Sequence, residues 1–362
     1  MTTEAVKTTD QGQTPKYAWV ILFAVFFASF VVPVNFFKVP VIFPVFMEEF
    51  GFSPDNIGWM MSMFTFISIV LAFPAAGLAR KFGYRKVAVV GIGACIAGGL
   101  IGVFAPNAGV LLAGRFLEGL AQGFFGVIAP AMLVPWFSRR HFGLAVGIWG
   151  IWMPAGGALM QNLTPWLYNT TGTWQSIYWF AIIFSAIILV VFLLLYREAP
   201  AGAQVVDEDA DAPRQKTNWG KVFSLSLIMA GVMFTIFNLA GNGTINTFLP
   251  TFLQMDKGLD NQTSGFVNSV FTIIAILGNA AAGFISDRLG TRKWLIVAGL
   301  IGMMIGEWLM FDFISTATMW TGVVITGVFQ AFASTCTSAS IPEIITDKKN
   351  VGWGMAMLGF AA

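Results

Sequence analysis

Long apolar runs alternate with short polar segments along the whole chain. Each run holds roughly 18 to 25 mostly apolar residues, the length of an α-helix that crosses a hydrocarbon core of about 30 Å. An eleventh run begins at Val351 and reaches only Ala362, which is too short to span a membrane. The pattern predicts an all-α, multi-pass membrane protein with ten helical runs, at residues 17–40, 56–78, 87–105, 109–134, 142–164, 174–196, 222–250, 264–285, 294–311 and 319–341.

The segment between the sixth and seventh runs has a different composition. Residues 198–221, EAPAGAQVVDEDADAPRQKTNWGK, are rich in Pro, Ala and charged side chains and cannot bury enough apolar surface to fold alone. We therefore expect a linker between two helical bundles. The predicted organisation is a tail at 1–16, an N-terminal six-helix bundle at 17–197, the linker at 198–221, and a C-terminal bundle at 222–362 that stops within its eleventh helix.

Composition supports a membrane protein and excludes several other classes. Hydrophobic residues make up 57% of the chain, charged residues 10%, and the mean hydropathy is +0.76, which is more apolar surface than a soluble core could hide. The net charge of +2 carries no information about partners, because the placement of charges is what matters in a membrane protein. We expect no nucleic-acid partner. Cys95 and Cys336 lie inside apolar runs and are expected to be free thiols. With His141 as the single histidine, no metal-ligand spacing and no phosphate-binding loop, we expect no enzyme activity, no cofactor and no metal.

Basic residues are concentrated on one side of the predicted membrane. Of the 20 Lys and Arg residues, Arg115 lies within a run, and only Lys38 and Lys257 fall at the side opposite to all the others. Because cytoplasmic loops carry the excess of basic residues, the N-terminus and the linker are predicted to be cytoplasmic. The expected location is the cell membrane, with the lipid bilayer as surroundings.

Two loops repeat one pattern, ARKFGYRK at 79–86 and GFISDRLGTRK at 283–293. Each follows the second helix of its predicted half, so the two halves are parallel repeats. Parallel repeats of this kind are typical of secondary transporters, whose binding sites lie at the repeat interface. Glycines allow the sharp turn between helices, and the basic residues hold the loop in the cytoplasm.

These loops resemble the cytoplasmic signature of the major facilitator superfamily. The first loop keeps Gly83 and Arg85 but carries Arg80 where the family has an acid, and the fourth run has the family's Arg-x-x-x-Gly pattern at Arg115 and Gly119. The resemblance implies two pseudo-symmetric six-helix bundles, transport by alternating access, and a monomer. The second loop supplies the fuller match, with Gly283, Asp287, Arg288, Gly290 and Arg292.

The resemblance also implies a gating role for the signature loops. In the family the acid of such loops stabilises one closed face, so Asp287 is expected to dock at residues 142–144, where the fifth helix begins. The alternative is a solvated loop that only sets topology. Arg80 cannot replace the acid in the first loop, and we expect Glu343 or Asp347 to balance its charge.

Three ionisable residues lie inside the predicted membrane spans: Arg115, Glu118 and Glu307. A charge at the centre of a spanning helix costs about 2.5 to 3.5 kcal/mol, so such residues usually pair or line a path. Arg115, Glu118 and Gln122 share one helix face. Two interpretations stay open for that face: it lines a transport cavity, or it forms a structural ion pair with a neighbouring helix. For Glu307, snorkelling or a local partner is expected.

Uncharged polar residues form further stripes on the seventh, eighth and tenth runs. Their amides and hydroxyls are suited either to coordinating a solute or to hydrogen bonds between helices, which contribute roughly 0.6 to 2 kcal/mol each. The candidates are Asn238 and Asn242 on the seventh run, Asn268 on the eighth, and Gln330 on the tenth.

The fifth and sixth runs resemble those of cyanate and nitrate/nitrite permeases. Nitrate porters of that branch use arginines from the second and eighth helices, which are missing here, so that site design is disfavoured. Arg115 and Lys38 could bind one small anion such as cyanate or a monocarboxylate, with Glu118 accepting a coupled proton. The alternatives are exchange with a counter-solute, transport of a neutral or lipophilic solute as in drug efflux, and a transporter-like receptor that does not translocate.

Overall fold

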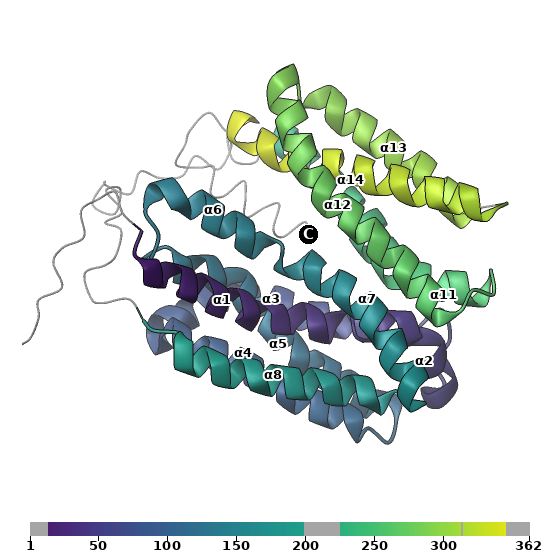
Figure 1. The fold of residues 1–362 in the computed structure, drawn as a ribbon, viewed down its shortest axis with the longest axis horizontal. Coiled ribbons are helices and arrows are strands. Elements are labelled where there is room, and N and C mark those ends of the chain that lie inside the picture. The colour runs from purple at the N-terminus through teal and green to yellow at the C-terminus, as the bar shows by residue number, and fades with distance from the viewer. Residues whose placement is uncertain (1–13, 199–224, 313, 345–362) are drawn as a thin grey trace, which may run out of the picture. The chain divides into compact units, whose positions relative to one another are not determined.

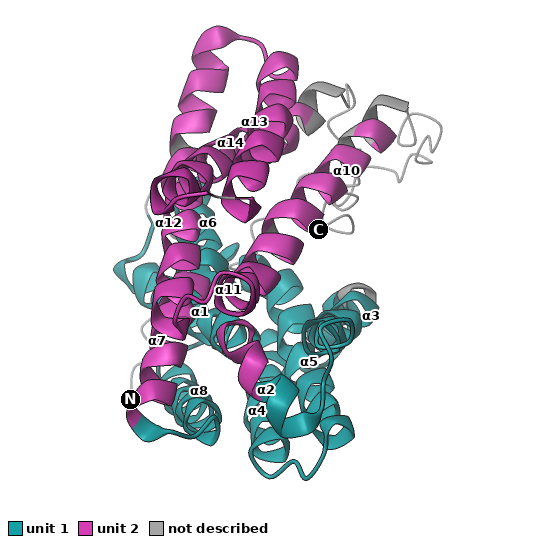
Figure 2. Cartoon of the chain, turned by 90° about the vertical axis from the view of Figure 1, so that its right-hand side faces the viewer, with its two compact units in different colours: residues 1–38, 46–156, 171–212 teal, residues 39–45, 157–170, 213–362 magenta. Residues whose placement is uncertain are grey.

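The computed structural model describes residues 14–198, 225–312 and 314–344. Within these ranges the regular structure is helical and no β-strand is present (Figure 1). The all-α class predicted from the apolar runs is therefore confirmed. Most contacts between residues lie within one of two groups, so the chain divides into two compact units, which are coloured separately in Figure 2. Unit 1 comprises residues 1–38, 46–156 and 171–212, and unit 2 comprises residues 39–45, 157–170 and 213–362.

Six whole helices lie within the described residues of unit 1, and α2 (Phe43–Phe50) and α7 (Trp152–Thr171) contribute to both units. The six are α1 (Lys16–Phe36), α3 (Trp59–Phe82), α4 (Tyr84–Val103), α5 (Ala108–Leu133), α6 (Arg139–Gly150) and α8 (Gln175–Leu195). Helix α5 contacts α1, α3, α4 and α6 and is the centre of this unit. It begins after Asn107, whose side chain accepts a hydrogen bond from the Val110 amide at 3.1 Å, as an N-cap residue does.

The described residues of unit 2 form the short 3₁₀ helix η1 (Pro40–Ile42) and six later elements. These are α10 (Leu225–Asn238), the π-helical segment η2 (Leu239–Ile245), α11 (Asn246–Met255), α12 (Asn261–Leu289), α13 (Lys293–Phe311) and α14 (Thr316–Ile344). Asp260 caps α12 by accepting hydrogen bonds from the Thr263 amide at 2.8 Å and the Thr263 hydroxyl at 2.6 Å. These hydrogen bonds lower the pKa of the Asp260 carboxyl, so the cap persists at moderately acidic pH.

All ten predicted runs coincide with helices of the structure, although three of them are interrupted. The first run ends as a regular helix at Phe36 and continues through η1 into α2. The fifth run is divided between α6 and α7 at Ile151, and the seventh contains the π-helical segment η2. Of the described helices, eight are long and apolar enough to span a membrane, or nine if the α3 segments 59–71 and 74–82, bent by 63°, form one span.

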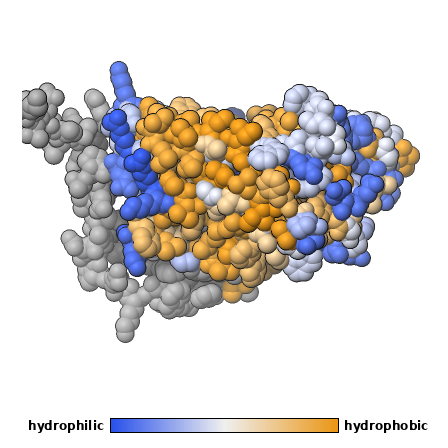
Figure 3. Space-filling view, turned by 90° about the horizontal axis from the view of Figure 1, so that it is seen from below, coloured by the Kyte–Doolittle hydropathy of each residue, from blue (hydrophilic) through white to orange (hydrophobic). Residues whose placement is uncertain are grey.

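The surface of these helices is strongly apolar. Figure 3 shows apolar side chains across the middle of one face, with hydrophilic side chains gathered toward its two ends. Large apolar side chains are exposed in both units, including Leu194 at 72%, Leu277 at 68% and Trp308 at 65%. Contiguous apolar surface of this extent is unfavourable in water and is typical of helices that face lipid.

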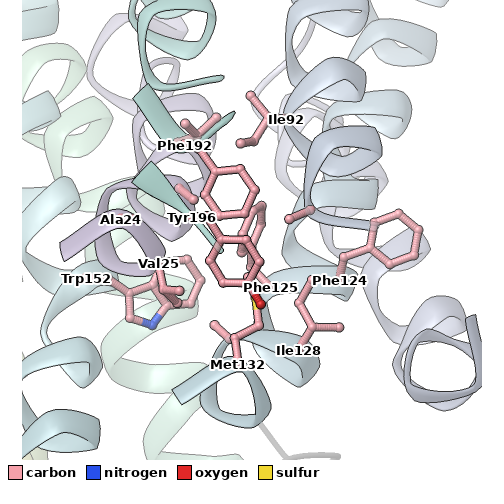
Figure 4. Packing of buried hydrophobic residues seen from close by; sticks show 14 of the residues in the cluster. Ala24, Val25, Ile92, Phe124, Phe125, Ile128, Met132, Trp152, Phe192 and Tyr196 are labelled. Atoms are coloured by element: carbon pink, nitrogen blue, oxygen red, sulfur yellow. The ribbon is translucent and has the colours of Figure 1, made fainter. Parts of the chain in front are cut away.

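The core of unit 1 packs around α5. Phe124, Phe125 and Ile128 of α5 pack among residues of neighbouring helices, including Phe192 of α8 (Figure 4). Glycines allow α5 to approach its neighbours closely. A Cβ added at Gly119 would overlap the carbonyl oxygen of Phe64 on α3. A side chain at position 119 would therefore force α3 and α5 apart.

We predict that Gly119→Ala destabilises the protein, because the added methyl group has no room against the backbone of α3. Overpacking of this kind costs about 1 to 3 kcal/mol. The matched control is Gly126→Ala on the same helix, where a Cβ would meet nothing within 4 Å. That control should be neutral or stabilising by roughly 0.5 to 1 kcal/mol, since alanine is the better helix former.

Thermal unfolding of both variants in detergent measures the difference. If Gly119→Ala unfolds at the same temperature as Gly126→Ala, the close contact between α3 and α5 is wrong.

Candidate substrate and coupling site

Arg115 and Glu118 form an ion pair inside unit 1. Arg115 Nη1 donates to Glu118 Oε2 at 2.7 Å, and the two residues are one helical turn apart on α5. Both are buried, with 1% of Arg115 and none of Glu118 exposed. The shared face predicted from the sequence therefore brings these two side chains into direct contact.

The remaining hydrogen bonds of Arg115 go to the backbone of neighbouring helices. The guanidinium donates to the carbonyl oxygens of Asn35 at 2.6 Å and Phe36 at 3.2 Å, at the C-terminal end of α1. It also donates through Nε to Met60 O at 3.0 Å, near the start of α3. The last carbonyls of a helix have no partner within that helix, so Arg115 satisfies two of them in α1. These contacts agree with the interpretation of Arg115 as part of a structural ion pair that joins α5 to neighbouring helices. They also hold the guanidinium in one position.

Lys38 is a third member of this site. Its ammonium group donates to Glu118 Oε1, the oxygen that Arg115 does not contact, and to Asn35 Oδ1 at 3.0 Å. It also lies over the ring of Tyr178 on α8, 3.9 Å from the ring centroid, in a cation–π contact. The sequence predicts Lys38 at the outer end of the first helix, as a candidate second cation for a small anion, but does not predict its contact with Glu118. The structure places it fully buried beside Glu118.

We call Lys38, Arg115 and Glu118 the charged triad. Two cations share one carboxylate, so the fully protonated bases give the triad a charge surplus of one. Isolated buried charges are costly, and pairs are far less so, which explains why the three groups gather on one another. Helix α4 provides the space: an added Cβ at Gly98 would lie 2.7 Å from Cγ of Glu118.

Gln122, the third candidate on this face of α5, lies one turn beyond Glu118. Its Oε1 atom is buried and has no hydrogen-bond partner among the described residues. Gln122 is thus available as an acceptor, and no hydrogen bond to the charged triad is found for that oxygen.

In unit 2 the interior polar residues are amides and hydroxyls. Asn246 Oδ1 accepts hydrogen bonds from Gln161 Nε2 at 3.4 Å and from the Thr272 hydroxyl at 3.2 Å. Asn268, a predicted candidate, donates to the Asn246 carbonyl at 3.3 Å. The Oε1 atom of Gln161 and the Oδ1 atom of Asn268 are buried without a partner in the described part of the chain. We call Gln161, Asn246, Asn268 and Thr272 the amide cluster.

The other uncharged candidates are distributed over α10 and α14. Asn238 donates to the carbonyl of Phe234 at 3.0 Å, one turn earlier on α10. Gln330 packs against Gly241 of η2, and its Oε1 atom is buried without a partner among the described residues. The side chain of Asn242 lies outside the described residues. Helix α10 contacts α14, so this pair of helices brings part of both predicted stripes together.

The signature loops form the turns predicted for them. Gly83 lies between α3 and α4 with φ +89°, and Gly290 ends α12 with φ +63°, conformations that glycine adopts without strain. Arg85 donates to the carbonyl of Leu193 at 2.8 Å. Asp287, whose side chain is 75% exposed, lies 3.4 Å from Arg292. Gly283 and Arg288 lie on α12, which runs from Asn261 to Leu289.

Two gating contacts stay predictions. Asp287 belongs to unit 2, whereas its expected docking site at residues 142–144 belongs to unit 1. The expected partners of Arg80 were Glu343 and Asp347, and the side chain of Glu343 and the whole of Asp347 lie outside the described residues.

The charged triad predicts unequal effects of two substitutions on stability. Glu118→Gln removes the carboxylate and leaves two buried cations together, and breaking a buried pair in this way costs about 3 to 5 kcal/mol. Lys38→Met keeps the Arg115–Glu118 pair and replaces the ammonium by an apolar side chain of similar length, so we expect a much smaller loss. Unfolding temperatures in detergent give the order, and a more stable Glu118→Gln variant would contradict the shared carboxylate.

Comparison with known proteins identifies a family and solved structures that resemble this fold. The family model described as Major Facilitator Superfamily matches residues 25–264 and 232–362. The solved structure of a D-xylose-proton symporter superposes with a TM-score of 0.78 at 14% identity, covering 96% of this chain and 87% of that one. At that identity the likeness concerns the fold.

Two curated relatives carry more specific names. A nitrate/nitrite transporter from Picosynechococcus is 28% identical over 136 residues, which is 37% of this chain and 24% of that transporter. The Escherichia coli protein named "Probable galactarate/D-glucarate transporter" is 22% identical over 326 residues, covering 76% of this chain and 71% of that one. The resemblance seen in the signature loops is confirmed, and the chain belongs to the major facilitator superfamily of membrane transporters.

Proposed function

We propose that this protein is a secondary active transporter that carries a small monocarboxylate together with a proton. In the proposed arrangement it lies in the cell membrane as a monomer, with its N-terminus in the cytoplasm, as the distribution of basic residues predicts. The substrate is a small-molecule solute, and the proton gradient supplies the driving force. The membership of the chain in a transporter family supports the general activity.

The charged triad is the observation that carries this proposal. Lys38 and Arg115 share the carboxylate of Glu118, and all three side chains are buried. A surplus positive charge in a dry interior is unfavourable unless an anion balances it. A solute with one negative charge would balance this surplus, whereas a neutral or lipophilic solute would leave it uncompensated. The triad therefore favours a monoanion over the alternatives of drug efflux or transport of a neutral solute.

The unpartnered oxygen of Gln122 favours a solute that also has a hydroxyl group. This oxygen is buried, lies one turn beyond Glu118 on α5, and accepts no hydrogen bond among the described residues. A buried acceptor without a donor costs about 1 to 3 kcal/mol, which a solute hydroxyl would recover. We therefore infer a hydroxy-monocarboxylate such as lactate.

The names of the relatives support an anionic solute. One relative is named for nitrate and nitrite and the other for galactarate and D-glucarate, all of which are anions. Nitrate itself is disfavoured on the sequence argument, because the interiors of α3 and α12 hold no arginine and Arg80 and Arg288 lie near the C-terminal ends of these helices. Cyanate stays a candidate, since it needs only the surplus charge.

The proposal predicts charge-selective transport in proteoliposomes. Labelled lactate should be taken up faster than its neutral amide, and faster than propionate, which lacks the hydroxyl group. Arg115→Gln removes one cation of the triad and should reduce lactate uptake at least about tenfold, the effect of roughly 1.4 kcal/mol. Lys257→Gln, a change of the same charge in the loop after α11, is the matched control and should retain uptake.

Protein-free liposomes correct for passive permeation, and cyanate and nitrate complete the set of solutes. Equal uptake of lactate and its amide, or uptake of none of the anions by the wild-type protein, would contradict the proposed substrate class.

The gating role of Asp287 gives a separate prediction. If its carboxylate docks at a helix N-terminus during transport, Asp287→Asn should lower the maximal transport rate and leave the solute concentration for half-maximal uptake nearly unchanged, because the dipole interaction contributes about 0.3 to 1 kcal/mol. Asp256→Asn, an exposed acid at the end of α11, is the control. Equal maximal rates for both variants would favour the solvated-loop interpretation.

A further inference from the structure

We propose that Lys38, and not Glu118, carries the coupled proton, so that one proton and one monoanion are taken up together at the charged triad. This inference rests on the proposed transport of a monoanion and adds the residue and the stoichiometry. It departs from the expectation that Glu118 accepts the proton, and it depends on contacts that only the structure reveals.

Glu118 contacts both cations of the triad. Its Oε2 atom accepts a hydrogen bond from Arg115, and its Oε1 atom accepts one from Lys38. Both carboxylate oxygens are therefore paired with a cation. Protonating Glu118 would leave both cations without their counter-charge in the interior. That is the costliest change of charge available to the triad.

The two cations, Arg115 and Lys38, differ in how readily they release a proton. Arginine stays protonated in proteins, whereas the amine of a buried lysine exchanges its proton readily. Loss of the proton from Lys38 leaves a neutral pair, Arg115 with Glu118, and removes the buried surplus charge. Gain of that proton restores a surplus of one, which a monoanion balances. The protonated lysine and the anion thus favour each other, and neither is favoured alone.

The groups that face Lys38 agree with this assignment. From α5 it meets Glu118 and Arg115, and from α8 the ring of Tyr178, whose hydroxyl has no hydrogen-bond partner among the described residues. Asn35 on α1 is uncharged, and the thiol of Cys95 on α4 is hydrogen-bonded to the Glu118 carbonyl at 3.6 Å. If Lys38 becomes neutral, the two remaining charges of the triad, on Arg115 and Glu118, are still paired with each other. A change of charge at Arg115 or Glu118 leaves no such balanced pair.

The position of Lys38 in the chain suggests how its charge could affect the conformation. It follows α1 and precedes η1, and it is the residue at which the backbone passes from unit 1 to the 39–45 segment of unit 2. Its ammonium group ties this connection to α5 through Glu118. When Lys38 is neutral, its ion pair with Glu118 is lost. The segment around Lys38 is then held less strongly against α5.

The proton balance is simple. A proton from the aqueous phase binds the lone pair of Lys38 Nζ, and the monoanion pairs with the surplus charge. Release on the other side returns the proton to water and the amine to its neutral form. One positive and one negative charge cross together, so the cycle is electroneutral.

The test measures lactate accumulation in proteoliposomes under a gradient of one pH unit. One-to-one coupling should sustain an accumulation of about tenfold, because one pH unit is a tenfold ratio of proton activity. Lys38→Arg keeps the cation but cannot release its proton, so its steady-state accumulation ratio should fall to about one, whatever its rate of lactate exchange. A potential imposed with valinomycin and potassium should leave wild-type accumulation unchanged.

A second measurement needs no variant. Calorimetric titration of the purified wild-type protein with lactate, in two buffers of different ionisation enthalpy, gives the number of protons taken up on binding. The expected value is close to one at a pH where the free triad is neutral.

The outcomes separate the two proposals. Lactate accumulation that Lys38→Arg leaves intact, a response to membrane potential, or binding without proton uptake would overturn the assignment of Lys38 and keep anion transport. Absence of wild-type lactate binding and exchange would overturn the proposed substrate itself.

Discussion

The carboxylate of Glu118, shared by two buried cations, is the interaction on which unit 1 depends. It joins α5 to the connection after α1 through Lys38, and it holds the guanidinium that satisfies the last carbonyls of α1. Because the two buried cations need the carboxylate between them, the positions of these elements are mutually constrained. Glycine at position 98 of α4 follows from the same constraint, since a side chain there would meet Glu118. Glycine at position 119 of α5 admits α3, whose Met60 carbonyl accepts a hydrogen bond from Arg115.

Helix positions could be predicted because the membrane imposes a length on every apolar run. The interruptions inside the runs could not be predicted, because hydropathy does not show where a helix ends within an apolar stretch. The helix of the first run ends at Phe36, where Arg115 satisfies the carbonyls of Asn35 and Phe36. The π-helical segment at 239–245, LAGNGTI, lies within the seventh run, and its glycines and Asn242 do not by themselves specify that change of helix type. These details depend on contacts between residues far apart in sequence.

The same limit explains which site residues could be predicted. Arg115 and Glu118 are three residues apart, so helical periodicity alone places them together. Lys38 lies 80 positions from Glu118 along the chain. Its inward direction depends on where α1 ends, and a lysine at the end of an apolar run ordinarily extends toward water. In the signature loops, local turn geometry fixes Gly83 and Gly290, whereas the docking of Asp287 depends on contacts between units that sequence spacing does not determine.

The two units differ in the chemistry of their interiors, and this difference bears on how a substrate is distinguished. Every fully buried charged side chain in the described part of the chain lies in unit 1, while the buried polar side chains of unit 2 are amides and hydroxyls. Charge recognises any small anion with similar strength, since a Coulomb interaction does not depend on the shape of the solute. Hydrogen bonds do depend on shape, and a polar site rejects a solute that leaves it unpaired. Under the proposed function, unit 1 alone offers both kinds of recognition, because the charged triad would supply the charge and the unpartnered amide oxygen of Gln122 would select among anions of equal charge.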